Sequence, residues 1–158
     1  MGRGTEGSYF RNMKRGLVVL VADDDPRDLQ IMHLAIKRNG VVAEIHEVHD
    51  GEQVIDYLRG ENDFADRGRH PFPDLLMLDL KMPKMDGLEV LGWLRKRPEY
   101  HRLPTIMLSG SGLEKDVEEA YRRGAATYFS KPASFKEFQE LIKSVIDYWE
   151  RSQRSKVR

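Results

Sequence analysis

Residues 17–26 read LVVLVADDDP, six consecutive apolar residues followed by three aspartates and a proline. An uninterrupted apolar run of this length is typical of a β-strand that is covered on both faces. Asp25 and Pro26 fit an N-cap and a first helical position, with Asp28 completing a box-like cap, and the helix is expected to end at Gly40. The stretch therefore predicts a buried strand that ends in acidic side chains and turns directly into a helix.

The same alternation of strand and helix continues along the chain. Further strands are expected at residues 41–48, 74–79, 104–109 and 126–129. Helices are expected after them at residues 51–59, 87–97, 113–123 and 134–149, with a loop at 61–73. Strands that alternate with helices form a parallel sheet covered on both faces, so we predict an α/β fold. In such sheets, functional groups gather at the carboxyl ends of the strands.

The composition describes a soluble single domain and excludes several classes of function. The 158 residues contain 26 Lys+Arg and 26 Asp+Glu, and this balance gives no electrostatic reason to expect nucleic acid or a membrane as the main partner. There is no cysteine, which rules out disulfides, thiolate catalysis and zinc–thiolate sites and fits a reducing cytoplasm. No apolar run approaches the ~20 residues that cross a bilayer. We expect a cytoplasmic protein.

The two ends of the chain differ from its middle. Residues 1–15 are rich in Gly and Arg and are expected to form a disordered tail, within which Met13 is an alternative start. Residues 151–158 are expected to be a frayed basic tail. The folded domain is therefore expected at residues 16–150.

Polar side chains end four of the expected strands. Asp23 and Asp24 follow the first strand, Asp79 ends the third, Ser109 ends the fourth, and Lys131 follows the fifth. Clustered carboxylates repel one another unless a cation neutralises them, and oxygen ligands of this kind suit Mg²⁺. A carboxylate nucleophile, a metal ion, an ammonium and a hydroxyl are the groups that phosphoryl transfer needs. Their joint arrival at one edge indicates a phosphoryl-transfer site.

Each of these residues also has a simpler interpretation when it is taken alone. Asp25 is better explained as an N-cap than as a metal ligand. Asp79 would serve as a helix cap, Lys131 as a surface lysine, Ser109 as a structural hydroxyl and Tyr128 as a half-buried strand aromatic. The functional hypothesis therefore depends on the whole set.

Four motifs, LVVLVADDDP, LLMLDLKMPKMDG, PTIMLSG and YFSKP, occur in this order. With them, residues 17–149 resemble a response regulator receiver domain. The segments ADDDPRDLQ and EEAYRRGAATYFSKP and the closing DYW are most similar to small regulators that are paired with phytochrome-type histidine kinases. The resemblance implies a flavodoxin-like sheet of order 2-1-3-4-5.

The resemblance also implies a role for each motif residue. Asp79 would be the phosphoacceptor. Mg²⁺ would be bound directly by Asp24, through water by Asp23, and by the backbone carbonyl of Lys81. Ser109 and Tyr128 would be the switch residues. Lys131 would bind the phosphoryl group, and Pro132 would follow a cis peptide bond.

The sequence departs from the family pattern at two places. Ser109 stands where threonine is commoner, which keeps the hydroxyl but loses a methyl group. The stretch between Gly60 and Asp74 is longer than in chemotaxis-type receivers, which leaves that loop uncertain but not the site.

Rival functions fit the sequence less well. A haloacid-dehalogenase-like phosphatase would need a second aspartate where this chain has Lys81. A receiver-like module that is not phosphorylated would lack the acids or the lysine. A transcription factor would need a DNA-binding motif, and none follows Trp149. We therefore expect a signalling protein rather than an enzyme.

The expected partners are a sensor histidine kinase and a second copy of the chain. The homodimer would use the fourth helix, the fifth strand and the last helix, where Phe135, Tyr148 and Trp149 are large apolar groups. The alternative for Trp149 is that it only closes the core.

Overall fold

The computed structural model of the chain describes residues 16–37 and 43–157. The expected N-terminal tail, the alternative start at Met13 and the helix end at Gly40 lie outside these residues. Within them, no helix is both long enough and apolar enough to cross a bilayer.

Five parallel strands form one sheet of order β2-β1-β3-β4-β5, as predicted. The strands are β1 (Leu17–Ala22), β2 (Ala43–Val48), β3 (Leu75–Leu78), β4 (Thr105–Ser109) and β5 (Thr127–Ser130). The helices are α2 (Pro26–Lys37), α3 (Gly51–Arg59), α4 (Gly87–Arg95), α5 (Glu114–Arg122) and α6 (Phe135–Val157), with short 3₁₀ turns η1 (Asn62–Phe64) and η2 (Pro98–Tyr100). This is the flavodoxin-like arrangement.

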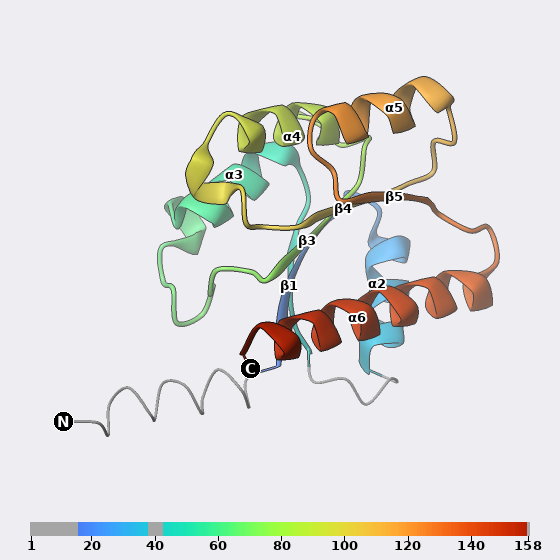
Figure 1. Ribbon diagram of the computed structural model, residues 1–158, viewed down its shortest axis with the longest axis horizontal. Coiled ribbons are helices and arrows are strands. Elements are labelled where there is room, and N and C mark those ends of the chain that lie inside the picture. The colour runs from blue at the N-terminus through green and yellow to red at the C-terminus, as the bar shows by residue number, and fades with distance from the viewer. Residues whose placement is uncertain (1–15, 38–42, 158) are drawn as a thin grey trace.

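The helices cover both faces of the sheet (Figure 1), with α3, α4 and α5 on one side and α2 and α6 on the other. Successive side chains of a strand point to opposite faces, so each strand feeds two cores. Leu76 and Leu78 pack in the core beneath α3 and α4, whereas Leu75 and Met77 pack in the core beneath α2 and α6. The central strands are buried on both faces, which explains why they read as continuous apolar runs.

Two helices end at places that the sequence analysis did not expect. Helix α4 stops at Arg95 rather than Arg97, because Pro98 disfavours the helical conformation at the residue before it, and Arg97 is extended (φ −121°, ψ 105°). Helix α6 continues through Val157, so residues 151–157, where a basic tail was expected, continue the last helix.

The loop at residues 61–73 is tied to α3 by hydrogen bonds. The Arg67 guanidinium donates to the backbone carbonyls of Tyr57 (2.7 Å), Leu58 (2.7 Å) and His70 (3.1 Å). Tyr57 is buried, and its hydroxyl donates to the carbonyl of Pro71 at 2.9 Å. The sequence predicted a loop here but did not predict that one arginine fixes it to the end of α3.

Candidate functional site

Two acids are held side by side where β1 and β3 end. The parallel ladder continues one residue past β1, since the Asp23 N–H donates to the Val48 carbonyl at 3.1 Å. It also continues past β3, since the Asp79 N–H donates to the Ala22 carbonyl at 2.9 Å. Asp23 and Asp79 are buried, whereas Asp24 is exposed. The sheet itself therefore places these carboxylates at its carboxyl edge, as the sequence analysis predicted.

Lys131 reaches the same edge from the end of β5. Its N–H donates to the Ser109 carbonyl at 2.7 Å, which extends the pairing of β4 with β5. Its Nζ lies 2.7 Å from Oδ2 of Asp23, 2.8 Å from Oδ2 of Asp28 and 3.3 Å from Oδ2 of Asp79. The ammonium is thus the centre of a cluster whose acids come from three other elements of the fold, β1, α2 and β3.

The expected cis bond before Pro132 is not present. Among the described residues there is no cis peptide, so the Lys131–Pro132 bond is trans and that prediction is wrong for this structure. The backbone hydrogen bond of Lys131 to β4 already directs its side chain along the carboxyl edge, and the ammonium reaches the carboxylates without a cis bond.

Asp28 is a member of the cluster that sequence reasoning missed as a site residue. It lies in the first turn of α2, where an acid is favoured by the positive end of the helix, and it was interpreted as part of a cap. The N-cap is Asp25, as predicted, since its Oδ1 accepts from the Arg27 N–H at 2.9 Å, whereas the Asp28 carboxylate is bonded to Lys131. The Asp25 N–H in turn donates to Oδ1 of Asp23 at 2.9 Å, which links the start of α2 to the site.

Burial and charge shift the pKa values of the cluster in a consistent way. Burial raises the pKa of Asp23 to about 6, although the hydrogen bond from Lys131 opposes the rise. Burial also raises the pKa of Asp79, against the lowering effects of Lys131 and of hydrogen bonds from the backbone of Leu80 and Lys81. Burial alone would lower the pKa of Lys131, but its bonds to Asp23 and Asp28 outweigh that effect and raise it. The lysine is therefore a cation that partly neutralises the buried acids.

The donor set fits a divalent metal ion. One carboxylate oxygen from each of Asp23, Asp24 and Asp79 lies within 4.8 Å of the other two. Two of the acids are buried, and burial without full neutralisation holds their pKa values up. Oxygen-only ligands that include an exposed carboxylate suit Mg²⁺, which keeps several of its waters. The carbonyl of Lys81 stays a prediction as a further ligand.

Two glycines lie in close contact with the segment from Asp79 to Met85, with no space for a side chain. A Cβ on Gly87 would lie 2.3 Å from the backbone oxygen of Asp79, and a Cβ on Gly51 would lie 2.1 Å from the backbone oxygen of Met85. Asp86 caps α4 by accepting from the Glu89 N–H at 2.8 Å. The helices α3 and α4 therefore begin in direct contact with the loop that carries Asp79.

Ser109 and Tyr128 are joined through the loop between β4 and α5. Ser109 is buried, and its Oγ accepts from the Ser111 N–H at 3.2 Å. The half-buried Tyr128 donates from its hydroxyl to the Ser111 carbonyl at 2.7 Å. Ser111 itself donates from Oγ to Oδ2 of Asp116 at 2.6 Å. Ser111 therefore connects the hydroxyl at the end of β4 to the aromatic side chain of β5.

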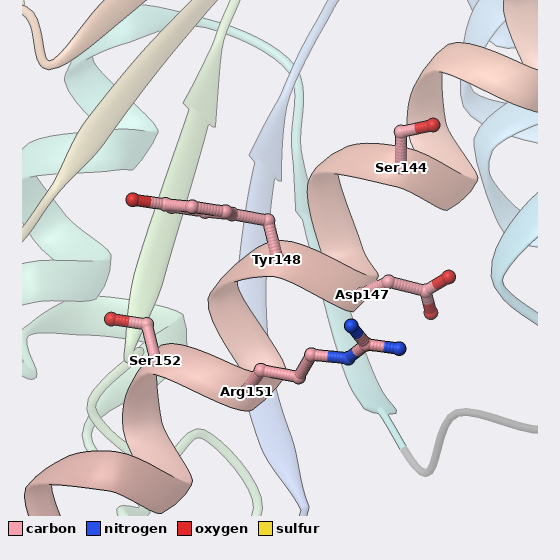
Figure 2. Close-up of a pocket in the computed structure, with 5 residues that line it drawn as sticks. All are labelled: Ser144, Asp147, Tyr148, Arg151 and Ser152. Carbon is pink, nitrogen blue, oxygen red and sulfur yellow. The ribbon is translucent and has the colours of Figure 1, made fainter.

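A hollow on the surface of α6 lies outside this cluster (Figure 2). It is lined by Ser144, Asp147, Tyr148, Arg151 and Ser152. These residues begin more than two turns beyond the start of α6 at Phe135, and none of them belongs to the acidic cluster. The hollow is therefore a feature of the helix surface and not the site of the predicted chemistry.

The response regulator receiver domain family matches residues 19–143, and the chain belongs to this family. A curated relative from Methanothrix harundinacea, the probable methanogenesis regulatory protein FilR2, is 30% identical over 149 residues, which are 94% of this chain and 94% of the relative.

Three solved structures of similar fold are response regulators, two of them from phytochrome or red-light signalling. The phosphorylated cyanobacterial phytochrome response regulator RcpA is 30% identical (TM-score 0.79, covering 85% of this chain and 94% of that one). RPA3017, from red light signalling of R. palustris, is 40% identical (TM-score 0.78, 84% and 93%). The Mn²⁺-bound response regulator Rcp1 of Synechocystis is 26% identical (TM-score 0.78, 85% and 94%). Proteins of this family act in two-component signalling.

Proposed function

We propose that the chain is a phosphorylation-driven switch in which Asp79 accepts a phosphoryl group from a sensor histidine kinase. The observation that carries the proposal is the position of Lys131 Nζ, which is bonded to Asp23 and lies 3.3 Å from Asp79. A carboxylate oxygen of Asp79 attacks phosphorus, the bond from phosphorus to the histidine nitrogen breaks, and an acyl phosphate forms. The phosphoryl group carries about 1.5–2 negative charges and replaces the single charge of the carboxylate, and Lys131 helps to offset them.

The same site is proposed to need Mg²⁺. Asp23, Asp24 and Asp79 would hold the ion, together with the carbonyl of Lys81, and the bound ion would supply charge neutralisation for phosphoryl oxygens. The clustered carboxylate oxygens support this proposal, as does the Mn²⁺ bound in the Rcp1 structure.

Asp79→Asn tests the assignment of the phosphoacceptor. With acetyl phosphate and Mg²⁺, the native chain should take up one phosphoryl group by intact mass, and the variant should take up none, because an amide cannot act as the nucleophile. Asp74→Asn, which alters another aspartate beside β3, is the matched control and should still be labelled. Labelling of Asp79→Asn to the native stoichiometry would refute the assignment.

The switch is proposed to run through Ser109 and Tyr128. Ser109 would turn its hydroxyl toward the phosphoryl group, and this movement would break its contact with Ser111, to which Tyr128 is also bonded. The change would then appear in α5, which follows Ser111 in the chain, in β5, which carries Tyr128, and in α6, which follows β5. A receiver of this kind biases an equilibrium between two conformations rather than creating a new fold.

The proposed phosphodonor is a histidine kinase of the phytochrome type. The support comes from the phytochrome and red-light regulators, which are 30% and 40% identical to this chain. Such phosphotransfer would take place in the cytoplasm, which fits a chain without cysteine. Hydrolysis of small phosphate esters is not proposed, because Lys81 stands where a phosphatase would need its second acid.

We also propose that α5, β5 and α6 form the face through which the chain dimerises or binds its kinase. Tyr121, Phe135 and Tyr148 are exposed on these elements, with 47%, 48% and 65% of their surface accessible. Trp149 packs partly against the core, which accounts for this residue without an interface.

Sedimentation at micromolar concentration tests the homodimer, and a stable interface needs about 1,000 Å² of buried surface. Tyr148→Ser should weaken self-association measured with and without beryllofluoride, a phosphoryl mimic, whereas the exposed Lys143→Ser on the same helix should not. A native chain that stays monomeric in both states would refute the dimer.

A further inference from the structure

We propose that Asp28 competes with the phosphorylated side chain of Asp79 for the Lys131 ammonium and thereby weakens the phosphorylated state. The inference rests on the proposed function and adds a positioning residue to it. The observation is the 2.8 Å bond from Lys131 Nζ to Asp28, which is shorter than its 3.3 Å contact with Asp79.

The lysine has no spare hydrogen in this cluster. An ammonium carries three N–H groups, and Lys131 directs its Nζ at three carboxylates, those of Asp23, Asp28 and Asp79. Its side chain is only 12% exposed, so water has limited access to it. When Asp79 gains phosphoryl oxygens that need a donor, Lys131 must therefore loosen its bond to one of its present partners.

Asp28 is the partner that is most easily released. The side chain of Asp23 is 1% exposed, so bulk water replaces the lysine there less readily than at Asp28. Asp23 is also fixed by the bond from the Asp25 N–H. The side chain of Asp28 is 23% exposed, and it lies at the start of α2, where the helix favours a negative charge even without a cation beside it.

Removing the charge of Asp28 should shift two affinities in opposite directions. Lys131 would move toward Asp79, and a negative charge near the phosphoryl group would be lost, so a phosphoryl mimic should bind more tightly. In the absence of the mimic, the released lysine would lie closer to Asp23 and Asp79 and compete better with a metal ion. Mg²⁺ alone should therefore bind more weakly.

The test is calorimetry on the full chain with Asp28→Asn, using Mg²⁺ alone and beryllofluoride at saturating Mg²⁺. A charge-assisted hydrogen bond of about 1 kcal/mol corresponds to roughly a fivefold change, so we expect about fivefold tighter beryllofluoride and about twofold to fivefold weaker Mg²⁺. Asp25→Asn is the matched control: Asn is an equally good N-cap, and Asp25 makes no bond to Lys131. The affinities of that control for Mg²⁺ and for beryllofluoride should stay within about twofold of those of the native chain.

A general loss of structure would weaken both ligands together, which is why the opposite shifts are diagnostic. Asp28→Ser, a second variant of different size, should show the same two directions. Unchanged or weaker beryllofluoride binding in the Asp28 variants, beside normal binding by the native chain, would overturn this inference alone. Failure of the native chain to bind beryllofluoride would refute the proposed function, and the inference with it.

Discussion

Lys131 at the carboxyl edge of the sheet and Arg67 in the loop after α3 each make three hydrogen bonds, but their partners differ in kind. Arg67 donates to backbone carbonyls, which are uncharged and fixed by the fold. Lys131 donates to carboxylates, which carry charge and can bind a metal ion instead. The first arrangement has no alternative partner and fixes a loop. The second can change partners, as a switch requires.

Replacing Lys131 should have the largest effect on stability. Lys131→Met leaves buried carboxylates without their cation, and breaking a buried ion pair from one side costs about 3 kcal/mol or more. We expect such a loss in urea unfolding at pH 7.5 without metal, and a partial recovery on adding Mg²⁺, which supplies positive charge to the same acids. A loss that Mg²⁺ leaves unchanged would contradict the proposed exchange of partners.

Arg67→Ala should destabilise the chain less, and its loss of stability relative to the native chain should be the same with and without Mg²⁺. Three carbonyls lose a charged donor, and we expect a loss of about 2 kcal/mol, or roughly 6 °C in Tm, by thermal unfolding. Arg69→Ala is the control, because its side chain is 84% exposed and should cost less than about 0.5 kcal/mol. If Mg²⁺ reduced the stability difference between Arg67→Ala and the native chain, the two regions would not be independent.

The last effect, which should be no larger than that of Arg67→Ala, is the pH dependence that Asp23 causes. Its folded pKa of about 6 lies above its ordinary value of 3.8, so the folded state binds more protons between these values. Stability from this group is therefore lost as pH rises from about 4 to 6, by up to about 2 kcal/mol. Without metal, Asp23→Asn should gain stability relative to the native chain over that range. A difference between the two chains that does not change with pH would contradict this prediction.

Much of the fold and of the site could be predicted from local sequence. The continuous apolar runs identify the central strands, and the alternation with helices fixes a parallel sheet, which then brings Asp23, Asp79, Ser109 and Lys131 to one edge. These inferences succeed because strand direction and side-chain periodicity depend on neighbouring residues.

The features that were missed depend on distant partners. Asp28 fits a helix cap by its local pattern, and its bond to Lys131 joins residues 103 positions apart. The Lys131–Pro132 bond was expected to be cis, but pairing with β4 already directs the lysine. Arg67 gives no sign in the sequence that it would bind carbonyls of α3, since those acceptors exist only once the helix has ended.

The contact between Gly87 and the backbone oxygen of Asp79 determines where added volume can go. A Cβ at Gly87 would lie 2.3 Å from that oxygen, so the chain at Asp79 has no space to retreat toward α4. A group added to the Asp79 carboxylate must therefore be accommodated by the side chains around that carboxylate, among them Asp24 and Lys131. Gly87 therefore restricts the backbone position of Asp79, so that enlarging the Asp79 side chain displaces its neighbours rather than its own backbone.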